Sequence, residues 1–165
     1  MSLNVETGTG SSTSESYASV AFFDSYHADR GNTLAATLST AEKEQALRRA
    51  TEYMIQAYRN RWQGYRRLVT QALDWPRSGI VIDDFTVIAY DSVPVDVQKA
   101  CAELAFKAAS GALLNDTGQT VIRKKVDVIE IEYDKNSSQS TQYKTIEAML
   151  RPYLTGGGFS HRLVR

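Results

Sequence analysis

The side chains that could carry acid–base or nucleophilic chemistry are few in this chain of 165 residues. The two histidines, His27 and His161, lie toward opposite ends of the sequence, and no serine or cysteine beside them has the setting of an activated nucleophile. Cys101, the single cysteine, follows Ala100 in a segment of helical periodicity, where a free thiol packs as a small apolar side chain. These residues predict no catalytic site, so we expect that the protein is not an enzyme.

Carboxylates and glycines also fail to form a recognisable ligand site. Asp83, Asp84 and Asp91 lack the spacing of a calcium-binding loop, and adjacent aspartates are typical of turns. Gly8 and Gly10 do not lie between a strand and a helix, as the glycines of a phosphate-binding loop do. A single cysteine excludes an internal disulfide and a cysteine-based metal cluster. We therefore expect no metal and no cofactor.

A local excess of positive charge lies between positions 48 and 77. The whole chain carries 19 basic and 19 acidic residues, but this stretch has seven arginines against Glu52 and Asp74, a charge of about +5. Aromatic side chains at Trp62, Tyr65 and Trp75 lie among these arginines, which are Arg48, Arg49, Arg59, Arg61, Arg66, Arg67 and Arg77.

Two interpretations of this segment fit its chemistry. Aromatic rings set in a basic groove can stack on the bases of single-stranded nucleic acid. Arginine and aromatic residues are also enriched at the centres of protein interfaces, where they supply contact area and bidentate hydrogen bonds. Because the net charge of the chain is zero, we favour a protein interface and keep nucleic acid as the alternative.

Helices must position most of these residues, because apolar side chains recur at helical spacing through much of the chain. The clearest start is Ser39 with Glu42, a capping box in which each side chain binds the other residue's backbone amide. Apolar β-branched residues around a polar pair indicate a hairpin at 80–88, and a second alternating run predicts a strand within 121–134. The predicted helices span 19–30, 39–61, 94–111 and 145–154.

These elements predict a mainly α fold, a small helical bundle with a β-hairpin or small antiparallel sheet and extended arms at both ends. Residues 1–16 are rich in Gly, Ser and Thr, which bury little apolar surface, so we expect a flexible N-terminal arm. Residues 17–154 form the helical domain, and residues 155–165 form a C-terminal docking tail with a glycine hinge. No signal peptide is recognisable, and no apolar run approaches the roughly 18 residues of a membrane span.

Several short motifs of the chain occur together in one protein family. The first is a tyrosine-rich helix end with the residues Tyr53, Tyr58, Arg61, Trp62 and Gly64. Two short runs follow it, QALDWPR at 71–77 and VPVDVQKA at 93–100. In this order they resemble the head-to-tail adaptor proteins of tailed bacteriophages, and the resemblance covers most of residues 16–114. Some relatives in that family are described as DnaT-like single-stranded DNA-binding proteins, so the resemblance carries two functional implications.

The first implication is a virion structural protein, a head-to-tail connector subunit. Its resemblance to the adaptors implies a homo-oligomeric ring of twelve copies that binds the portal protein and a tail, stopper or tail-terminator protein. DNA would pass through the lumen without sequence recognition, and no membrane is involved. We therefore predict a location in the virion neck, after assembly in the cytoplasm of a bacterial host. The residues predicted to contact other subunits or the portal are Arg59, Arg61, Trp62, Tyr65, Arg66, Arg67, Arg77, Phe159, His161, Arg162 and Arg165.

The second implication, kept as the alternative, is a single-stranded DNA-binding replication accessory protein. It would use four arginines of the basic segment, Arg59, Arg61, Arg66 and Arg67, with Trp62 and Tyr65. The WPR motif is open to a third interpretation as core. There Trp75 would be buried, Pro76 would set a turn, and Arg77 would pair with an acid.

Overall fold

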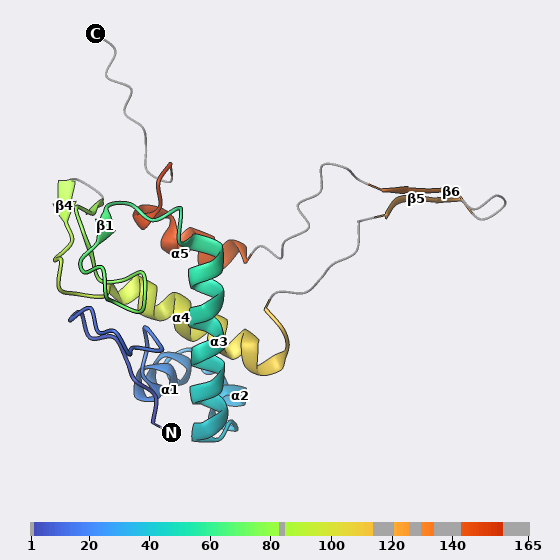
Figure 1. Ribbon diagram of the computed structural model, residues 1–165. Coiled ribbons are helices and arrows are strands. Elements are labelled where there is room, and N and C mark those ends of the chain that lie inside the picture. The colour runs from blue at the N-terminus through green and yellow to red at the C-terminus, as the bar shows by residue number, and fades with distance from the viewer. Residues whose placement is uncertain (1, 83–84, 114–120, 126–129, 134–142, 157–165) are drawn as a thin grey trace, which may run out of the picture.

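The structure, a computed structural model, describes residues 2–82, 85–113, 121–125, 130–133 and 143–156. Two crossing helices, α3 (Thr40–Tyr58) and α4 (Val95–Ser110), pack against each other at its centre (Figure 1). The predicted capping box is present at the start of α3, where the Ser39 hydroxyl accepts from the Glu42 amide and the Glu42 carboxylate accepts from the Ser39 amide. This confirms the long second helix that the sequence predicted.

The contact between α3 and α4 depends on small side chains. On α4, Ala100, Cys101 and Ala105 are fully buried, and they let the backbone of a neighbouring helix approach closely. On α3, Leu47 and Met54 are likewise buried. Two helices thus share one apolar core, as their periodicity predicted.

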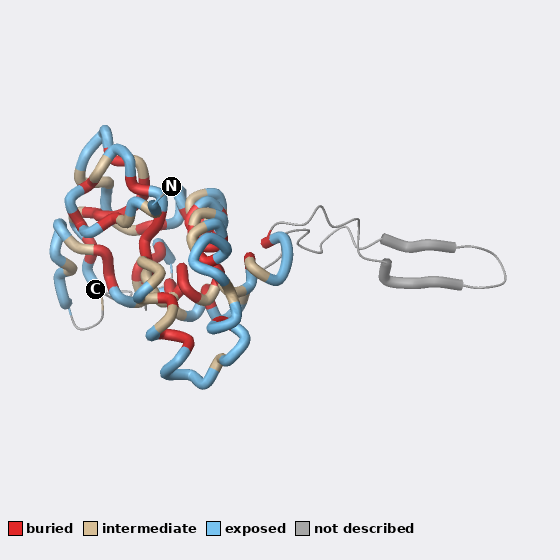
Figure 2. Tube along the Cα trace, turned by 90° about the horizontal axis from the view of Figure 1, so that it is seen from below, coloured by how far each residue is buried: buried red, intermediate tan, exposed pale blue. Residues whose placement is uncertain are grey.

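The remaining helical segments surround this pair. They are α1 (Val20–Ala28), α2 (Thr33–Ala36), α5 (Lys144–Leu150) and the short 3-10 helix η2 (Arg151–Tyr153). Buried positions line the helices and continue into the connecting loops (Figure 2). The predicted fold class, a mainly α bundle with small antiparallel sheets, is confirmed.

The strands form two-stranded antiparallel pairs. β1 (Tyr65–Arg66) pairs with β2 (Arg77–Ser78), and β3 (Val81–Ile82) pairs with β4 (Thr86–Val87), which confirms a hairpin within 80–88. Where the sequence predicted one strand within 121–134, the structure has two, β5 (Val121–Lys125) and β6 (Glu130–Tyr133), which pair with each other. Residues 126–129 lie outside the described residues.

The N-terminal segment differs from the flexible arm that its composition predicted. The Glu6 side chain is buried, and its carboxylate accepts hydrogen bonds from the backbone amides of Gly8, Gly10 and Ser11 at 2.8–3.0 Å. Gly8 packs so tightly that a Cβ there would lie 1.9 Å from the Asp91 carbonyl oxygen. Charge-assisted hydrogen bonds and backbone packing order residues 2–16 where apolar burial could not.

His27 and Cys101 lie in surroundings that are typical of residues packed inside a fold. Both ring nitrogens of His27 have partners, the Ala102 carbonyl at 3.2 Å and the Asn32 side chain at 3.3 Å. The thiol of Cys101 is buried near the Thr51 and Ser16 hydroxyls, and burial raises its pKa. A protonated, buried thiol is a poor nucleophile. Within the described ranges, no helix combines the length and the apolar character needed to cross a membrane.

Candidate functional site

The WPR motif lies in the core and shapes the connection between α3 and the hairpin. Trp75 is fully buried between Trp62 and Tyr153, with ring centroids 5.6 and 5.7 Å away. Arg77 is also buried, and its guanidinium donates to the carbonyl oxygens of Gln63 and Gly64, each at 2.8 Å. The interpretation of this motif as core is therefore the one that the structure supports.

Arg77 does not pair with a carboxylate, as that interpretation had assumed. Its third contact is with the backbone carbonyl of Asp74 at 3.3 Å, while the Asp74 carboxylate binds Arg59 at 3.0 Å. Burial lowers the pKa of Arg77, because the charged form loses hydration. The Arg77 side chain thus hydrogen-bonds backbone carbonyls on both sides of β1, and its buried guanidinium is not available to a partner on the surface.

Trp62 was predicted to be a contact residue, but it is buried against Tyr58 and Trp75. A ring that is only 4% exposed cannot stack on a nucleobase. Three residues later, Tyr65 is 68% exposed. Sequence spacing alone could not separate the two, because the chain turns at Gly64 (φ 62°) before it enters β1.

Arg67 joins an exposed aromatic ring to the N-terminal segment. Its guanidinium donates to the Gly8 carbonyl at 2.8 Å and lies 4.9 Å from the ring centroid of Tyr90. Tyr90 is 57% exposed, and the sequence had not suggested it as a site residue. Its position shortly before Pro94 gave no signal, since a lone tyrosine in a loop has no periodicity to interpret.

The other predicted arginines fall into two groups. Arg59 pairs with Asp74 and Arg61 pairs with Glu147, and the latter contact lowers the pKa of the Glu147 carboxyl. Arg66 is half-buried and donates to the Gln71 carbonyl. Among the described residues, neither Arg66 nor Arg67 has a carboxylate within ion-pair distance. Within the described part of the chain, no ion pair therefore compensates the charge of these two arginines.

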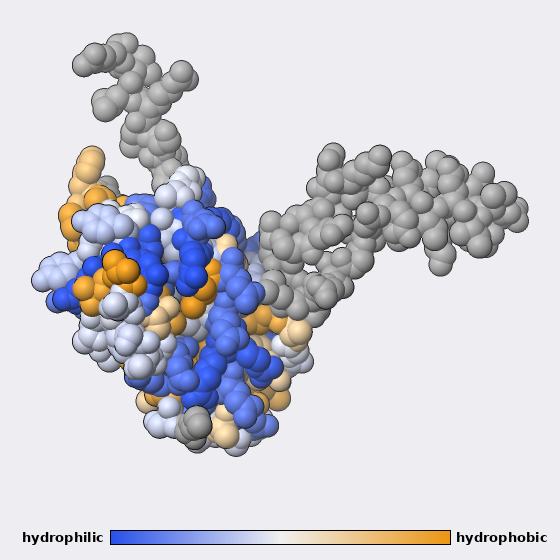
Figure 3. Space-filling view, in the orientation of Figure 1, coloured by the Kyte–Doolittle hydropathy of each residue, from blue (hydrophilic) through white to orange (hydrophobic). Residues whose placement is uncertain are grey.

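We define the basic–aromatic surface as Tyr65, Arg66, Arg67 and Tyr90. Leu68 and Val69 extend it with exposed apolar side chains. Figure 3 shows orange and blue side chains next to each other on the left of the molecule, the side where β1 and β4 lie in Figure 1. The remaining predicted contact residues, Phe159, His161, Arg162 and Arg165, lie outside the described residues.

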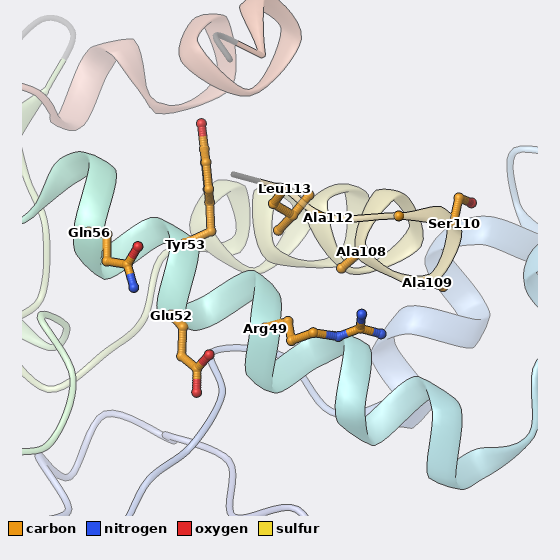
Figure 4. Close-up of a pocket in the computed structure, with 10 residues that line it drawn as sticks. Arg49, Glu52, Tyr53, Gln56, Ala108, Ala109, Ser110, Ala112 and Leu113 are labelled. Carbon is orange, nitrogen blue, oxygen red and sulfur yellow. The ribbon is translucent and has the colours of Figure 1, made fainter. Parts of the chain in front are cut away.

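A pocket of about 450 Å³ opens between α3 and the C-terminal end of α4. Figure 4 shows that its polar side chains diverge: Glu52 and Gln56 point away from Leu113, and Tyr53 points toward α5. The pocket thus brings no acid, base and nucleophile together. In the part of the chain that the structure describes, no three His, Cys, Asp or Glu side chains gather as metal ligands would.

One comparison with known proteins gives a match over the whole chain. A family model described as "Putative DnaT-like ssDNA binding protein" matches residues 1–165. No curated protein and no solved structure matches the chain.

This match overturns the prediction of a head-to-tail connector. It supports the alternative of single-stranded DNA binding. The twelve-fold ring and the portal and tail partners were predicted only as parts of the connector role, so these predictions are wrong as well. The predicted placement in a virion neck depended on that role and is not carried forward. The error came from giving more weight to motifs that the structure places in the core, Trp75 and Arg77 among them, than to the charge of the exposed segment beside them.

Proposed function

Because the chain belongs to the DnaT-like ssDNA-binding protein family, we propose that it binds single-stranded DNA through the basic–aromatic surface. The observation that carries this proposal is the placement of two exposed tyrosine rings beside two arginines without a carboxylate partner among the described residues. We also propose that the protein acts by binding and catalyses no reaction.

Tyr65 offers a largely exposed ring, because 68% of the residue is accessible to solvent. A Cβ on Gly79 would lie 3.4 Å from the ring atom Cε1 of Tyr65, so the ring lies beside the turn between β2 and β3. An exposed tyrosine ring can stack on a base of single-stranded DNA.

Arg67 and Tyr90 form a second contact point. The guanidinium has five N–H donors, and one nitrogen is held by the Gly8 carbonyl. The remaining donors suit a phosphate oxygen, while the adjacent Tyr90 ring suits a base. Since the whole chain is neutral, this local charge must supply the electrostatic attraction to the DNA backbone.

The proposal is tested by fluorescence anisotropy with a 5′-labelled oligo-dT of about 20 nucleotides, titrated at several salt concentrations. We expect binding that weakens as salt rises, because counterions are released from the phosphates. Arg67→Ala should weaken binding and reduce the slope of log K against log salt by about 0.7, the value for one phosphate contact on a single strand.

Arg49→Ala provides the charge-matched control, since Arg49 is an exposed arginine of α3 that does not belong to the basic–aromatic surface. Because Arg67 also holds Gly8, the thermal midpoint of each variant is measured alongside. A folded wild-type chain without affinity for oligo-dT at low salt, or equal losses for the two arginine variants, would contradict the proposed site.

A further inference from the structure

The N-terminal segment closes into a loop, because two points of its own backbone pair with each other. Val5 and Ser16 form a parallel bridge, and the Glu6 amide donates to the Ser16 carbonyl at 2.9 Å. The residues between these points, 7–15, contain no helix or strand, and we call them the N-terminal loop. The course of this loop therefore depends on contacts other than those of regular secondary structure.

The Glu6 carboxylate supplies these contacts from inside the loop. Its oxygen Oε1 accepts from the amides of Gly8 and Gly10 at 2.8 and 3.0 Å. The second oxygen, Oε2, accepts from the Ser11 amide at 2.9 Å and from the Ser14 hydroxyl at 3.0 Å. Hydrogen bonds to an ionised acceptor are stronger than those between neutral groups. The loop is thus built around one carboxylate.

The N-terminal loop in turn holds the segment 67–72, which carries part of the basic–aromatic surface. The Gly8 carbonyl accepts from the Arg67 guanidinium at 2.8 Å. At the other end of the segment, the Ala72 amide donates to the Ser11 carbonyl at 2.9 Å. Gly8 and Ser11 both donate their own amides to Glu6, so the two residues that hold this segment are themselves held by the same side chain.

The N-terminal loop also has a fixed position relative to Tyr90. Gly8 packs against the backbone of Asp91, the residue that follows Tyr90 in the connection between β4 and α4. Figure 1 shows the loop, in blue, beside this yellow-green connection. Gly8 thus contacts Arg67 and the chain next to Tyr90 at once, and the guanidinium lies 4.9 Å from the Tyr90 ring centroid.

Holding the Arg67 guanidinium in advance has a consequence for binding. A long side chain that is free in solution loses rotamer freedom when it binds a phosphate, which weakens binding about 2- to 12-fold. The Gly8 carbonyl restricts the Arg67 side chain before DNA binds, so part of this loss has already occurred in the folded protein.

Resting on the proposed function, we infer that Glu6 is a positioning residue for single-stranded DNA. It fixes Gly8 at the place from which the Gly8 carbonyl orients the Arg67 guanidinium toward a phosphate. Glu6 is only 3% exposed, so it does not touch the DNA itself. The buried carboxylate therefore strengthens the binding of an anion, although its own charge repels anions.

The test is a double-mutant cycle of Glu6→Gln and Arg67→Ala in the full chain, measured by anisotropy with the labelled oligo-dT. Glutamine keeps the size of the side chain but turns an NH₂ group toward donors that one carboxylate oxygen had accepted. We expect Glu6→Gln to weaken binding about 2- to 12-fold, the range for fixing one long side chain on binding. In the Arg67→Ala background the same substitution should change the affinity less than about twofold, because the residue through which it acts is absent.

The direction of the effect separates positioning from simple electrostatics. Loss of a negative charge near a DNA-binding surface should strengthen binding by charge alone, whereas loss of positioning weakens it. The slope of log K against log salt should stay close to the wild-type value in Glu6→Gln, because the phosphate contact of Arg67 is still made.

Glu15→Gln is the matched control, since it removes the same charge from the same loop. The Glu15 carboxylate accepts from the Asn4 amide and pairs with Arg48, neither of which belongs to the basic–aromatic surface. This variant should bind oligo-dT within about twofold of the wild-type chain, the limit of additivity for independent sites. Thermal midpoints show that each variant is folded at the assay temperature.

Ser14→Ala provides a milder form of the same change. It removes one donor to the Glu6 carboxylate, so we expect a smaller loss of affinity that also disappears in the Arg67→Ala background. It takes the place of Glu6→Gln in the cycle if that variant is unfolded at the assay temperature.

Unchanged or tighter binding by folded Glu6→Gln would overturn the inference. A loss of equal size with and without Arg67 would also overturn it, because the substitution would then disturb the surface in general. In both cases the wild-type chain still binds oligo-dT and the proposed function stands. A wild-type chain that does not bind oligo-dT would overturn the proposed function, and this inference with it.

Discussion

Two groups of arginine and aromatic side chains come from the same short stretch of sequence and have opposite environments. In the first group, Trp75 and Arg77 are buried and every nitrogen contact of the guanidinium is with the backbone. In the second, Tyr65 is largely exposed and Arg67 contacts the N-terminal segment and the Tyr90 ring. Both groups combine aromatic rings with an arginine, so the function of such an arginine depends on whether the fold already uses its donors.

Trp75→Ala should have the largest effect on the buried group. Removing a ring packed between Trp62 and Tyr153 leaves a cavity, and we expect the free energy of unfolding to fall by about 3–5 kcal/mol. Urea denaturation monitored by circular dichroism measures this change. A loss below about 1 kcal/mol would mean that this residue is not part of the core contact.

Arg77 tests whether a buried arginine serves the fold or the ligand. Arg77→Ala leaves three backbone carbonyls without their donor, and we expect a loss of about 1–3 kcal/mol of unfolding free energy. Arg77→Lys should be nearly as unstable, because a single ammonium cannot reproduce the fork of donors. If the lysine variant instead restored both stability and DNA affinity, Arg77 would act as a point charge toward DNA.

Tyr65→Ala should show the reverse pattern in the exposed group. Loss of one stacking surface weakens binding to oligo-dT about 5- to 100-fold, whereas the unfolding free energy changes by less than about 0.5 kcal/mol. Anisotropy titration and urea denaturation of the same preparation give both values. Tyr65→Phe is the control, since it keeps the ring and should retain most of the affinity.

The pair between Arg61 and Glu147 should give the smallest effect. Both side chains are more than a third exposed, so solvent screens the pair and we expect Glu147→Gln to change stability by less than about 1 kcal/mol. The folded pKa of Glu147 is lowered, so the pair contributes above the carboxyl's usual pKa and its contribution disappears as the pH falls through the folded pKa. Denaturation of the wild-type and variant chains at pH 7 and pH 3 checks this. The difference between them should be smaller at the lower pH.

Much of the helical framework could be predicted because its signals are local. The capping box at Ser39 and Glu42 and the small-residue stripe around Cys101 each act within one helix. Helix α4 lies within one residue of its predicted ends, whereas α3 begins one residue later and ends three residues earlier than predicted. Hairpin 80–88 was predictable for the same reason. Apolar β-branched residues on either side of a polar pair are visible in the sequence without knowledge of the rest of the fold.

The site could be predicted only in part, because it depends on contacts between distant segments. Arg67 meets Gly8 and Tyr90 across the fold, and no spacing in the sequence relates the three. Trp62 and Tyr65 differ in burial because the chain turns between them. The N-terminal segment was misjudged because its order comes from Glu6 binding backbone amides, a polar interaction that composition does not reveal.

The packed N-terminal segment also makes Cys101 a reporter of local opening. Its thiol lies 3.8 Å from the Ser16 hydroxyl, directly beneath the end of that segment. A thiol reagent can reach it only when the segment lifts or the domain unfolds, so the labelling rate under native conditions measures the equilibrium between closed and open forms. Addition of DNA that contacts Arg67 would slow this labelling. Arg67 hydrogen-bonds Gly8, so it connects the basic–aromatic surface to the N-terminal segment that covers the cysteine.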